Sequence, residues 1–274
     1  MAEQSLTDKV TVPRVRAHKR ARGADPLVML TAYDTPGALI ADGAGVDVIL
    51  VGDSVANNVL GYPDTLHVDV DAMAHHVGAV SRARTRALVV GDLPWMSYHL
   101  SPLEAVRNAA VLVRAGAEAV KLEGGRSRVE VVEALLNAQI PVMGHLGLTP
   151  QSVLAMGGYK VQAKEAAAAE ALLQDAKDLA TAGCFAMVLE GVPDVVAARV
   201  TSGVDVPTIG IGAGAGCDGQ VLVFHDLLGL NRGKAPKFVR RYAQLAEVAT
   251  EAVRSWAADV RDGSFPSEAE TYHA

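Results

Sequence analysis

The feature that most limits the fold of this chain is a repeated alternation of apolar and helical segments along its 274 residues. Short runs rich in Val, Ile and Leu recur, and each is followed by turn residues and then by a helical pattern. Runs that are apolar throughout are typical of parallel strands covered by helices. The eight runs are 27–32, 46–51, 87–90, 119–122, 141–144, 184–189, 207–211 and 220–224.

The segments between these runs carry helix start and stop signals. The segment 101–104 (Ser-Pro-Leu-Glu) combines a capping serine, a proline at the first helical position and a glutamate three residues after the cap. The segment 127–130 (Ser-Arg-Val-Glu) repeats the capping pair, and the Ala-rich segment 165–182 ends at Gly183, a suitable C-cap. Eight strand–helix repeats predict an α/β fold, the closed (β/α)8 TIM barrel, with an open doubly wound sheet as the alternative.

The barrel is predicted to form one domain, 1–274, with tails at 1–10 and 263–274. Only the eight residues 212–219 separate the last two runs, which is too short for a crossover helix, so the seventh βα unit is predicted to be degenerate. A basic pattern at 14–22 predicts a short N-terminal helix that closes the barrel floor. The segment 234–262 predicts one or two C-terminal helices.

Composition argues against several classes of protein. The residues are 50% hydrophobic and 20% charged, which allows a large buried core, and the formal net charge of −6 argues against nucleic-acid binding. The polar N-terminus lacks the apolar core of a secretory signal, and no stretch of about 18 apolar residues predicts a membrane span, so a cytoplasmic protein is expected. The two cysteines, Cys184 and Cys217, predict buried thiols rather than a disulfide framework.

Acidic residues fall at the ends of four predicted strands. In a parallel barrel these ends form one face, where such enzymes build their active sites. Lys121 lies two residues before the acid of its strand and therefore points to the same side, and His145 ends the fifth run. The four acids are Asp53, Asp92, Glu123 and Glu190.

Each of these residues also has a purely structural explanation. A single Asp after a strand is more often a helix cap or turn residue than a ligand, Lys121 could balance a neighbouring charge, and His145 could be a satisfied core histidine. Together they are harder to explain in this way, because carboxylates that converge on one barrel mouth repel unless a cation lies among them. Hard oxygen ligands suit Mg²⁺, which keeps water ligands and accepts a chelating substrate.

The glycine-rich segment 210–215 satisfies the G-x-G-x-x-A pattern of dinucleotide-binding folds. That site needs a helix directly after the glycines, so that the helix N-terminus meets the pyrophosphate. Here a strand-like run follows almost at once, and we reject a nucleotide site. Close approach of the backbone to a neighbouring strand or a substrate explains the glycines better.

Six short motifs follow one another in a particular order, and the longest of them, GHLGLTPQ at 144–151, is the most specific. In this order they resemble the ketopantoate hydroxymethyltransferase family from roughly Thr11 to Arg261. The motifs are VGDS (51–54), GDLP (91–94), KLEG (121–124), GHLGLTPQ (144–151), LEG (189–191) and IGIGAG (209–214).

The resemblance implies a TIM-barrel enzyme of pantothenate and coenzyme A biosynthesis. Such an enzyme transfers a hydroxymethyl group from 5,10-methylenetetrahydrofolate to 3-methyl-2-oxobutanoate and forms 2-dehydropantoate. The resemblance also implies Mg²⁺ as cofactor, a reduced folate and a small 2-oxo acid as ligands, and a cytoplasmic homodecamer that is a pentamer of dimers.

The resemblance assigns a role to each matching position. Asp53, Asp92 and Glu123 would surround the Mg²⁺, directly or through water. Contacts to the 2-oxo acid would come from Ser54, Lys121 and the two aspartates, Asp53 and Asp92.

Glu190 would be the general base, and His145 would lie beside the reacting centre. The substrate proton lies next to a ketone and is too weakly acidic for a bare carboxylate at pH 7. A metal that binds the keto oxygen, and the charge of Lys121, would stabilise the enolate, so that Glu190 could take the proton.

Three other hypotheses are open. A lyase or mutase of the phosphoenolpyruvate-mutase type would also use Mg²⁺ and a 2-oxo acid, but would turn over without folate. A Schiff-base aldolase would use Lys121, although Glu123 beside it should keep the amine charged. A non-enzymatic scaffold or metabolite-binding module would keep its function after Asp53→Ala.

Overall fold

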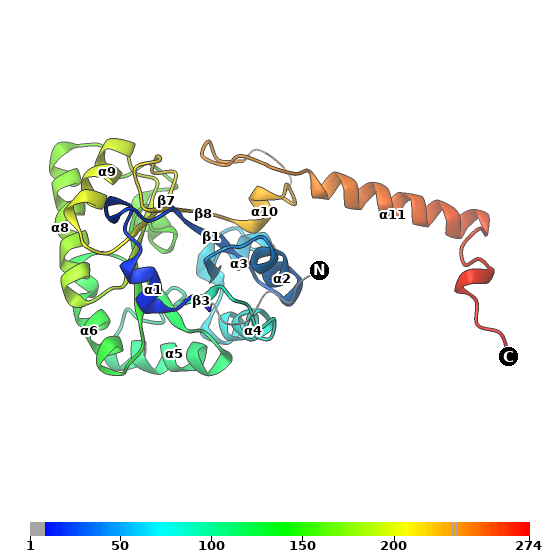
Figure 1. Ribbon diagram of the computed structural model, residues 1–274, viewed down its shortest axis with the longest axis horizontal. Helices are drawn as coiled ribbons and strands as arrows, with labels where there is room; N and C mark the ends of the chain where they lie inside the picture. Colours follow the sequence, from blue (N-terminus) through cyan, green and yellow to red (C-terminus); the bar gives the residue numbers. More distant parts are fainter. Residues whose placement is uncertain (1–8, 232, 234) are drawn as a thin grey trace. The chain divides into compact units, whose positions relative to one another are not determined.

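The computed structural model describes residues 9–231, 233 and 235–274. The chain divides into two compact units, Met1–Phe224 and His225–Ala274, and the first unit holds all the strands of the barrel (Figure 1). Most of the predicted N-terminal tail, 1–10, lies outside the described residues. That the whole of 1–274 is one domain stays a prediction.

Parallel strands close into a barrel within the described residues. They are β1 (Leu27–Thr31), β2 (Val48–Val51), β3 (Leu88–Asp92), β4 (Ala119–Glu123), β5 (Val142–Gly147), β6 (Ala186–Glu190), β7 (Thr208–Ile211) and β8 (Gly219–Leu222). Each strand pairs with the next, and β8 pairs with β1. Every predicted run overlaps a strand, so the TIM barrel is confirmed and the open doubly wound sheet is wrong.

The barrel interior is filled by alternate side chains of the strands, which point inward. Val48 and Leu50 come from β2, and Leu88 and Val90 from β3, and all four are buried in one apolar cluster. Such layers of branched residues make the inside of a TIM barrel a solid core rather than a pore. Within the interior of the barrel, polar side chains can therefore gather only at its two ends.

Helices follow the strands around the outside of the barrel (Figure 1). The longer ones are α2 (Thr35–Gly43), α4 (Val70–Ser81), α5 (Pro102–Ala115), α6 (Val129–Asn137), α8 (Ala166–Ala182) and α9 (Asp194–Gly203). Short elements lie in the loops between strands and helices: α3 (Val55–Asn58), η3 (Thr65–His67), η4 (Arg126–Arg128), η5 (Pro150–Ser152) and α7 (Val153–Met156).

Local capping explains where several of these helices begin and end. Ser101 Oγ accepts a hydrogen bond from the backbone N–H of Glu104 at 3.2 Å, as predicted, and Gly183 ends α8 with φ +109°. The predicted cap at Ser127 is wrong. Ser127 lies inside the η4 turn, and Arg128 occupies the N-cap of α6 without a side-chain hydrogen bond.

The seventh unit is degenerate, as predicted, because the described loop from β7 to β8 contains no helix. Its glycines allow close approach to neighbouring elements. A Cβ at Gly214 would lie 2.5 Å from Asp194 Cβ, and one at Gly219 would lie 2.6 Å from the Leu27 carbonyl oxygen on β1. The glycines therefore serve backbone packing, as expected, and strand β8 rather than a helix follows them directly.

The N-terminal segment packs against the floor of the barrel, the end at which the strands begin. Helix α1 (Val12–Ala17) and the 3₁₀ turn η2 (Arg20–Arg22) replace the single helix predicted at 14–22. The helix is interrupted because Lys19 turns inward, where its Nζ lies 2.7 Å from Asp218 Oδ2 and 2.7 Å from the Thr201 carbonyl oxygen. Val15 on α1 belongs to the apolar core of the barrel, so the predicted closing of the floor is confirmed.

The C-terminal unit contains most of α10 (Phe224–Leu227), and all of α11 (Leu245–Asp262) and η6 (Glu268–Glu270). In the described part of the predicted helical segment 234–262, the helical residues are 245–262. The described residues before position 245 follow an irregular path, in which the Tyr242 N–H donates to the Leu227 carbonyl oxygen at 2.8 Å. The predicted tail 263–274 includes the η6 turn, which a reciprocal capping box between Ser267 and Glu270 closes.

Candidate active site

The candidate site residues lie at the C-terminal ends of the strands. Asp92, Glu123 and Glu190 are the last residues of β3, β4 and β6, and Asp53 follows β2 by two residues. In a parallel barrel these ends share one mouth. The hydrogen bonds and ion pairs among the side chains show that they form a single cluster.

Asp92 links two neighbouring parts of this cluster. Its Oδ1 lies 2.8 Å from Lys121 Nζ, and the exposed fractions of the two side chains are 2% and 4%. Its Oδ2 accepts a hydrogen bond from the Asp53 backbone N–H at 3.2 Å. Asp92 and Lys121 are direct partners in the β3–β4 register, which explains why the ion pair forms at this level of the barrel.

His145 on β5 lies between two carboxylates. Its Nδ1 is 3.3 Å from Glu123 Oε1, and its Nε2 is 3.3 Å from Glu190 Oε2. Lys121 Nζ also lies 3.3 Å from His145 Nδ1. The imidazole therefore joins Glu190 to the remainder of the cluster.

Glu190 differs from the other carboxylates in its access to the outside. Its side chain is 16% exposed, whereas those of Asp92 and Glu123 are 2% and 3% exposed. Its observed cationic contact is with a histidine, while Asp92 contacts Lys121. Of these three acids, Glu190 is the one that a ligand entering the mouth reaches most readily.

Burial makes the charges of this cluster interdependent. Burial raises the pKa of Asp53 well above its ordinary value, and the charges of Asp92 and Glu123 raise it further. Burial also raises the pKa of Asp92, although Lys121 opposes the shift. Burial would raise the pKa of Glu123 too, but the hydrogen bond and the charge of His145 lower it. The cluster has an excess of negative charge that a cation would relieve.

The two cationic side chains respond in the opposite sense. Burial and the charge of Lys121 would lower the pKa of His145, yet its contacts with Glu123 and Glu190 raise it to about 9. Burial would lower the pKa of Lys121, but Asp92 and the other acids raise it. An ammonium held in this way is a poor Schiff-base nucleophile, which argues against the aldolase hypothesis.

Ser54 lies at the edge of the cluster, directly before α3. Its Oγ and the Tyr33 hydroxyl are 2.8 Å apart, and its carbonyl oxygen accepts a hydrogen bond from Asn58 Nδ2 at 2.7 Å. Ser54 is partly exposed. Its contact with substrate stays a prediction.

Two residues in the cluster, Gln151 and Tyr98, were given no role by the sequence. Gln151 Nε2 donates to Asp53 Oδ2 at 2.8 Å, and the Gln151 backbone N–H donates to Glu123 Oε2 at 3.0 Å. The Tyr98 hydroxyl donates to Gln151 Oε1 at 2.6 Å. Gln151 closes the most specific sequence motif, which was the one signal for it; nothing in the sequence pointed to Tyr98.

The fit of this cluster to Mg²⁺ depends on which carboxylate oxygens have no hydrogen-bond or ion-pair partner and can bind the ion. Within the described ranges, no three His, Cys, Asp or Glu side chains form a ready-made metal cage. Both carboxylate oxygens of Glu123 have partners, while no described residue donates to Oδ1 of Asp53. The residues therefore fit an ion that takes few direct protein ligands and keeps water, as Mg²⁺ does, and not a fully protein-bound metal.

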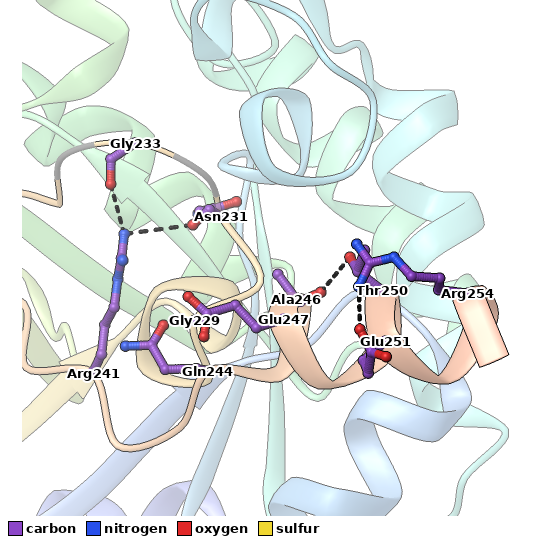
Figure 2. A pocket seen from close by; sticks show the side chains of 10 residues that line it. All are labelled: Gly229, Asn231, Gly233, Arg241, Gln244, Ala246, Glu247, Thr250, Glu251 and Arg254. Atoms are coloured by element: carbon purple, nitrogen blue, oxygen red, sulfur yellow. Dashed lines mark hydrogen bonds and ion pairs between the residues drawn. The ribbon is translucent and has the colours of Figure 1, made fainter.

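A separate open pocket of about 640 Å³ lies in the C-terminal unit (Figure 2). Arg241 donates there to the carbonyl oxygens of Asn231 and Gly233, and Arg254 pairs with Glu251. None of the candidate site residues lines this pocket, and two glutamates balance its two arginines. The barrel mouth, where buried ionisable groups converge, is the better candidate for catalysis.

Comparison with known proteins decides the family. The family model for ketopantoate hydroxymethyltransferase matches residues 9–268. The chain belongs to the ketopantoate hydroxymethyltransferase family. The match includes all the motifs quoted above, so the resemblance seen in the sequence is confirmed.

Relatives in this family are similar over almost their whole length. 3-Methyl-2-oxobutanoate hydroxymethyltransferase 2 of Bradyrhizobium diazoefficiens is 53% identical over 99% of this chain and 91% of its own. The 3-methyl-2-oxobutanoate hydroxymethyltransferase of Oleidesulfovibrio alaskensis is 55% identical over 97% of this chain and 92% of its own. This member of the ketopantoate hydroxymethyltransferase family is thus an enzyme of the transferase class.

Solved structures share the barrel at much lower identity. Phosphonopyruvate hydrolase has a TM-score of 0.62 at 13% identity and covers 97% of this chain and 92% of its own. A 2,3-dimethylmalate lyase of the PEP mutase/isocitrate lyase superfamily has a TM-score of 0.60 at 17% identity, with coverages of 95% and 91%. At these identities the likeness shows the fold alone and does not favour the lyase or mutase hypothesis.

Proposed function

We propose that this chain transfers a hydroxymethyl group from 5,10-methylenetetrahydrofolate to 3-methyl-2-oxobutanoate and forms 2-dehydropantoate for pantothenate and coenzyme A biosynthesis. Its family membership over residues 9–268 is the observation that carries the proposal. The cluster at the barrel mouth supports it, because a buried ammonium, several acids and one accessible carboxylate suit proton abstraction next to a ketone.

Asp53, Asp92 and Glu123 are the proposed holders of Mg²⁺, directly or through water. When bound, the ion would accept the keto and carboxylate oxygens of the oxo acid and stabilise negative charge on them. Lys121 places its ammonium 2.8 Å from Asp92, where it contributes a second positive charge beside the substrate. Ser54, with Asp53 and Asp92, completes the proposed contacts to the oxo acid.

Glu190 is the proposed general base. It removes the proton from C3 of the oxo acid, and the electron pair of that C–H bond forms the enolate. The methylene carbon of the folate gains a bond to the enolate carbon and a bond to the oxygen of a water molecule, and it loses its bonds to both folate nitrogens, N5 and N10. The proton taken from C3 and the proton released by the water balance the electron pairs left on those nitrogens, so that tetrahydrofolate is the leaving group. His145, 3.3 Å from Glu190, orients the carboxylate and balances its charge.

A homodecamer in the cytoplasm is proposed on the resemblance to the family. The exposed apolar side chains of α11 support self-association, since none of the residues of that helix is buried. No helix in the described part of the chain is both long and apolar enough to cross a bilayer. No nucleic-acid partner is proposed, in keeping with the net charge of −6.

The proposal is tested by following deuterium exchange at C3 of 3-methyl-2-oxobutanoate and net product formation in the same samples. We expect exchange to require Mg²⁺ but not folate, and product to require the methylene donor as well. Samples with EDTA and samples with tetrahydrofolate lacking the methylene group are the controls. Rapid conversion of the oxo acid without any folate would contradict the proposal and favour a lyase or mutase.

A further inference from the structure

We propose that Gln151 is a positioning residue that sets the carboxylates of Asp53 and Glu123 for Mg²⁺, with Tyr98 fixing the orientation of its side-chain amide. The proposal rests on the proposed function, because it concerns the same metal site. It assigns a role to two side chains that neither touch the reacting atoms nor serve as metal ligands.

The first observation is the contact with Asp53. Gln151 Nε2 lies 2.8 Å from Asp53 Oδ2 and 2.9 Å from the Leu93 carbonyl oxygen, so both of its protons are used. An amide nitrogen can only donate, and it therefore requires an unprotonated oxygen at Asp53. The contact holds Oδ2 on the amide and leaves the other oxygen of the carboxylate for the ion.

The second observation is that the side-chain amide of Gln151 is fixed in one of its two flipped orientations. Gln151 Oε1 accepts from the Tyr98 hydroxyl at 2.6 Å, and the Tyr98 oxygen in turn accepts from the Glu123 N–H at 3.1 Å. A flipped amide would place its oxygen against two acceptors, Asp53 and the Leu93 carbonyl. The chain of donors, Glu123 N–H to Tyr98 to Gln151 to Asp53, therefore runs in one direction only.

The third observation is that Gln151 also contacts the other acid. Its backbone N–H donates to Glu123 Oε2 at 3.0 Å. Asp53 follows β2 and Glu123 ends β4, and β3 separates these two strands in the barrel. One residue from the loop after β5 thus spans the mouth and fixes the distance between two proposed metal carboxylates.

Burial makes the hydrogen bonds of Gln151 and Tyr98 costly to lose. Gln151 is 4% exposed and Tyr98 is 1% exposed, so water is poorly placed to replace a lost hydrogen bond. Groups that orient metal ligands typically change metal affinity by about 10- to 100-fold when they are removed. A neutral amide is also required, because a carboxylate at this position would add a further negative charge beside Asp53.

The test is a calorimetric titration of Mg²⁺ into the full-length protein without oxo acid or folate. Gln151→Met keeps the length of the side chain and the backbone N–H to Glu123 but removes the amide, and we expect Mg²⁺ to bind about 10- to 100-fold more weakly. Gln174→Met is the matched control, since Gln174 is exposed on α8 and its Nε2 donates to Asp178. Its Mg²⁺ affinity should equal that of the wild type.

Steady-state kinetics separates positioning from a general loss of structure. In Gln151→Met, the Mg²⁺ concentration for half-maximal rate should rise by a similar factor, while kcat at saturating Mg²⁺ recovers most of its wild-type value. Tyr98→Phe keeps the buried ring and removes only the hydroxyl, and it should shift Mg²⁺ affinity in the same direction by a smaller factor. This second variant decides the matter if Gln151→Met does not fold.

Failure of the inference about Gln151 and failure of the proposed function give different results. If the wild type binds Mg²⁺ and folded Gln151→Met, or Tyr98→Phe in its place, binds it equally well, the inference about Gln151 is wrong and the proposed function is untouched. If the wild type itself forms no product and binds no Mg²⁺, the proposed function and its metal site are wrong. Weaker binding in both variants, with Gln174→Met unchanged, supports the inference.

Discussion

Asp53 has a carboxylate that the barrel buries among other carboxylates. The pKa of this group is raised by burial first and then by Asp92 and Glu123. A folded state that holds a proton more tightly than the unfolded chain loses stability as pH rises above the ordinary pKa, 3.8 for this residue. At neutral pH the ionised carboxylate of Asp53 therefore lowers the stability of the metal-free protein, and Mg²⁺ binding removes this destabilisation.

Asp53→Asn should separate stability from function. The metal-free variant should be more stable than the wild type at pH 7, on the order of 1 kcal/mol, the size of a typical single-residue effect. Its advantage should shrink as pH falls toward 4, and its binding of Mg²⁺ should be lost. Thermal unfolding in EDTA across this pH range measures the first effect, and an unchanged difference between the two proteins at every pH would contradict it.

At the scale of residues, the sequence predicted the acids and missed their supports. Asp92 and Glu123 could be located because they end apolar runs, and strand ends of a parallel barrel meet at one mouth. Gln151 could not be placed, because its contact with Asp53 spans 98 residues and depends on the path of the loop after β5. Without that path, the sequence does not distinguish Gln151 from other polar loop residues.

At the scale of elements, the end of β5 positions the end of β6. Gly147 has φ +94°, and a Cβ there would lie 2.3 Å from the Glu190 carbonyl oxygen and 2.7 Å from Val192 Cγ1. Gly147 and Glu190 are also partners in the β5–β6 register. Any side chain at Gly147 must therefore move the backbone that carries the proposed base.

Gly147→Ala should lower kcat by on the order of 10- to 100-fold, the cost of a displaced catalytic group, while Mg²⁺ affinity stays close to that of the wild type. Gly23→Ala is the control, because Gly23 also has a positive φ, +87°, but a Cβ there meets nothing within 4 Å. Kinetics and Mg²⁺ titration on both variants measure the effect. Equal activities of the two variants would show that β5 does not position Glu190.

The floor of the barrel depends on the buried pair of Lys19 and Asp218, whose side chains are 6% and 1% exposed. Lys19→Met leaves Asp218 without its cation and should lower the free energy of unfolding by about 3 kcal/mol or more. Lys9→Met breaks the exposed pair with Glu118 and should cost about 1 kcal/mol or less. Urea unfolding measures the free energy of unfolding of both variants. A Lys19→Met protein as stable as Lys9→Met would contradict the stabilising role given to the pair of Lys19 and Asp218.

Strands were predicted more accurately than helix ends. Each apolar run became a strand because only a buried parallel strand uses such a run in a barrel. The N-terminal helix was predicted too long, because Lys19 leaves the helix for an acceptor that lies 199 residues further along the chain. Local propensity contains no information about such a partner.

At the scale of the whole molecule, α11 presents an apolar face that its own residues do not cover. Val248, Trp256 and Val260 follow a helical spacing and are 64%, 54% and 46% exposed. An 18-residue amphipathic helix is only marginally stable in water without a surface to cover its apolar face. Among the described helices, α11 is the one whose apolar face is best suited to contacts between copies of the chain.

The proposed homodecamer can be checked by light scattering coupled to size exclusion. The wild type should elute with ten times the mass of one chain, and Trp256→Arg should yield smaller species because it places a charge in the apolar face. Glu247→Arg changes a charge elsewhere on α11 and should leave the mass unchanged. A monomeric wild type, or an unchanged mass for Trp256→Arg, would contradict the role given to this face.

The central claim is that Glu190 takes a proton from an oxo acid held at the barrel mouth, and it is tested most directly by C3 deuterium exchange in Glu190→Gln. The variant keeps the shape of the side chain and removes the base. Exchange should fall by roughly 100-fold or more, the scale of a lost general base, while Mg²⁺ and the oxo acid still bind. Exchange at the wild-type rate would contradict the account.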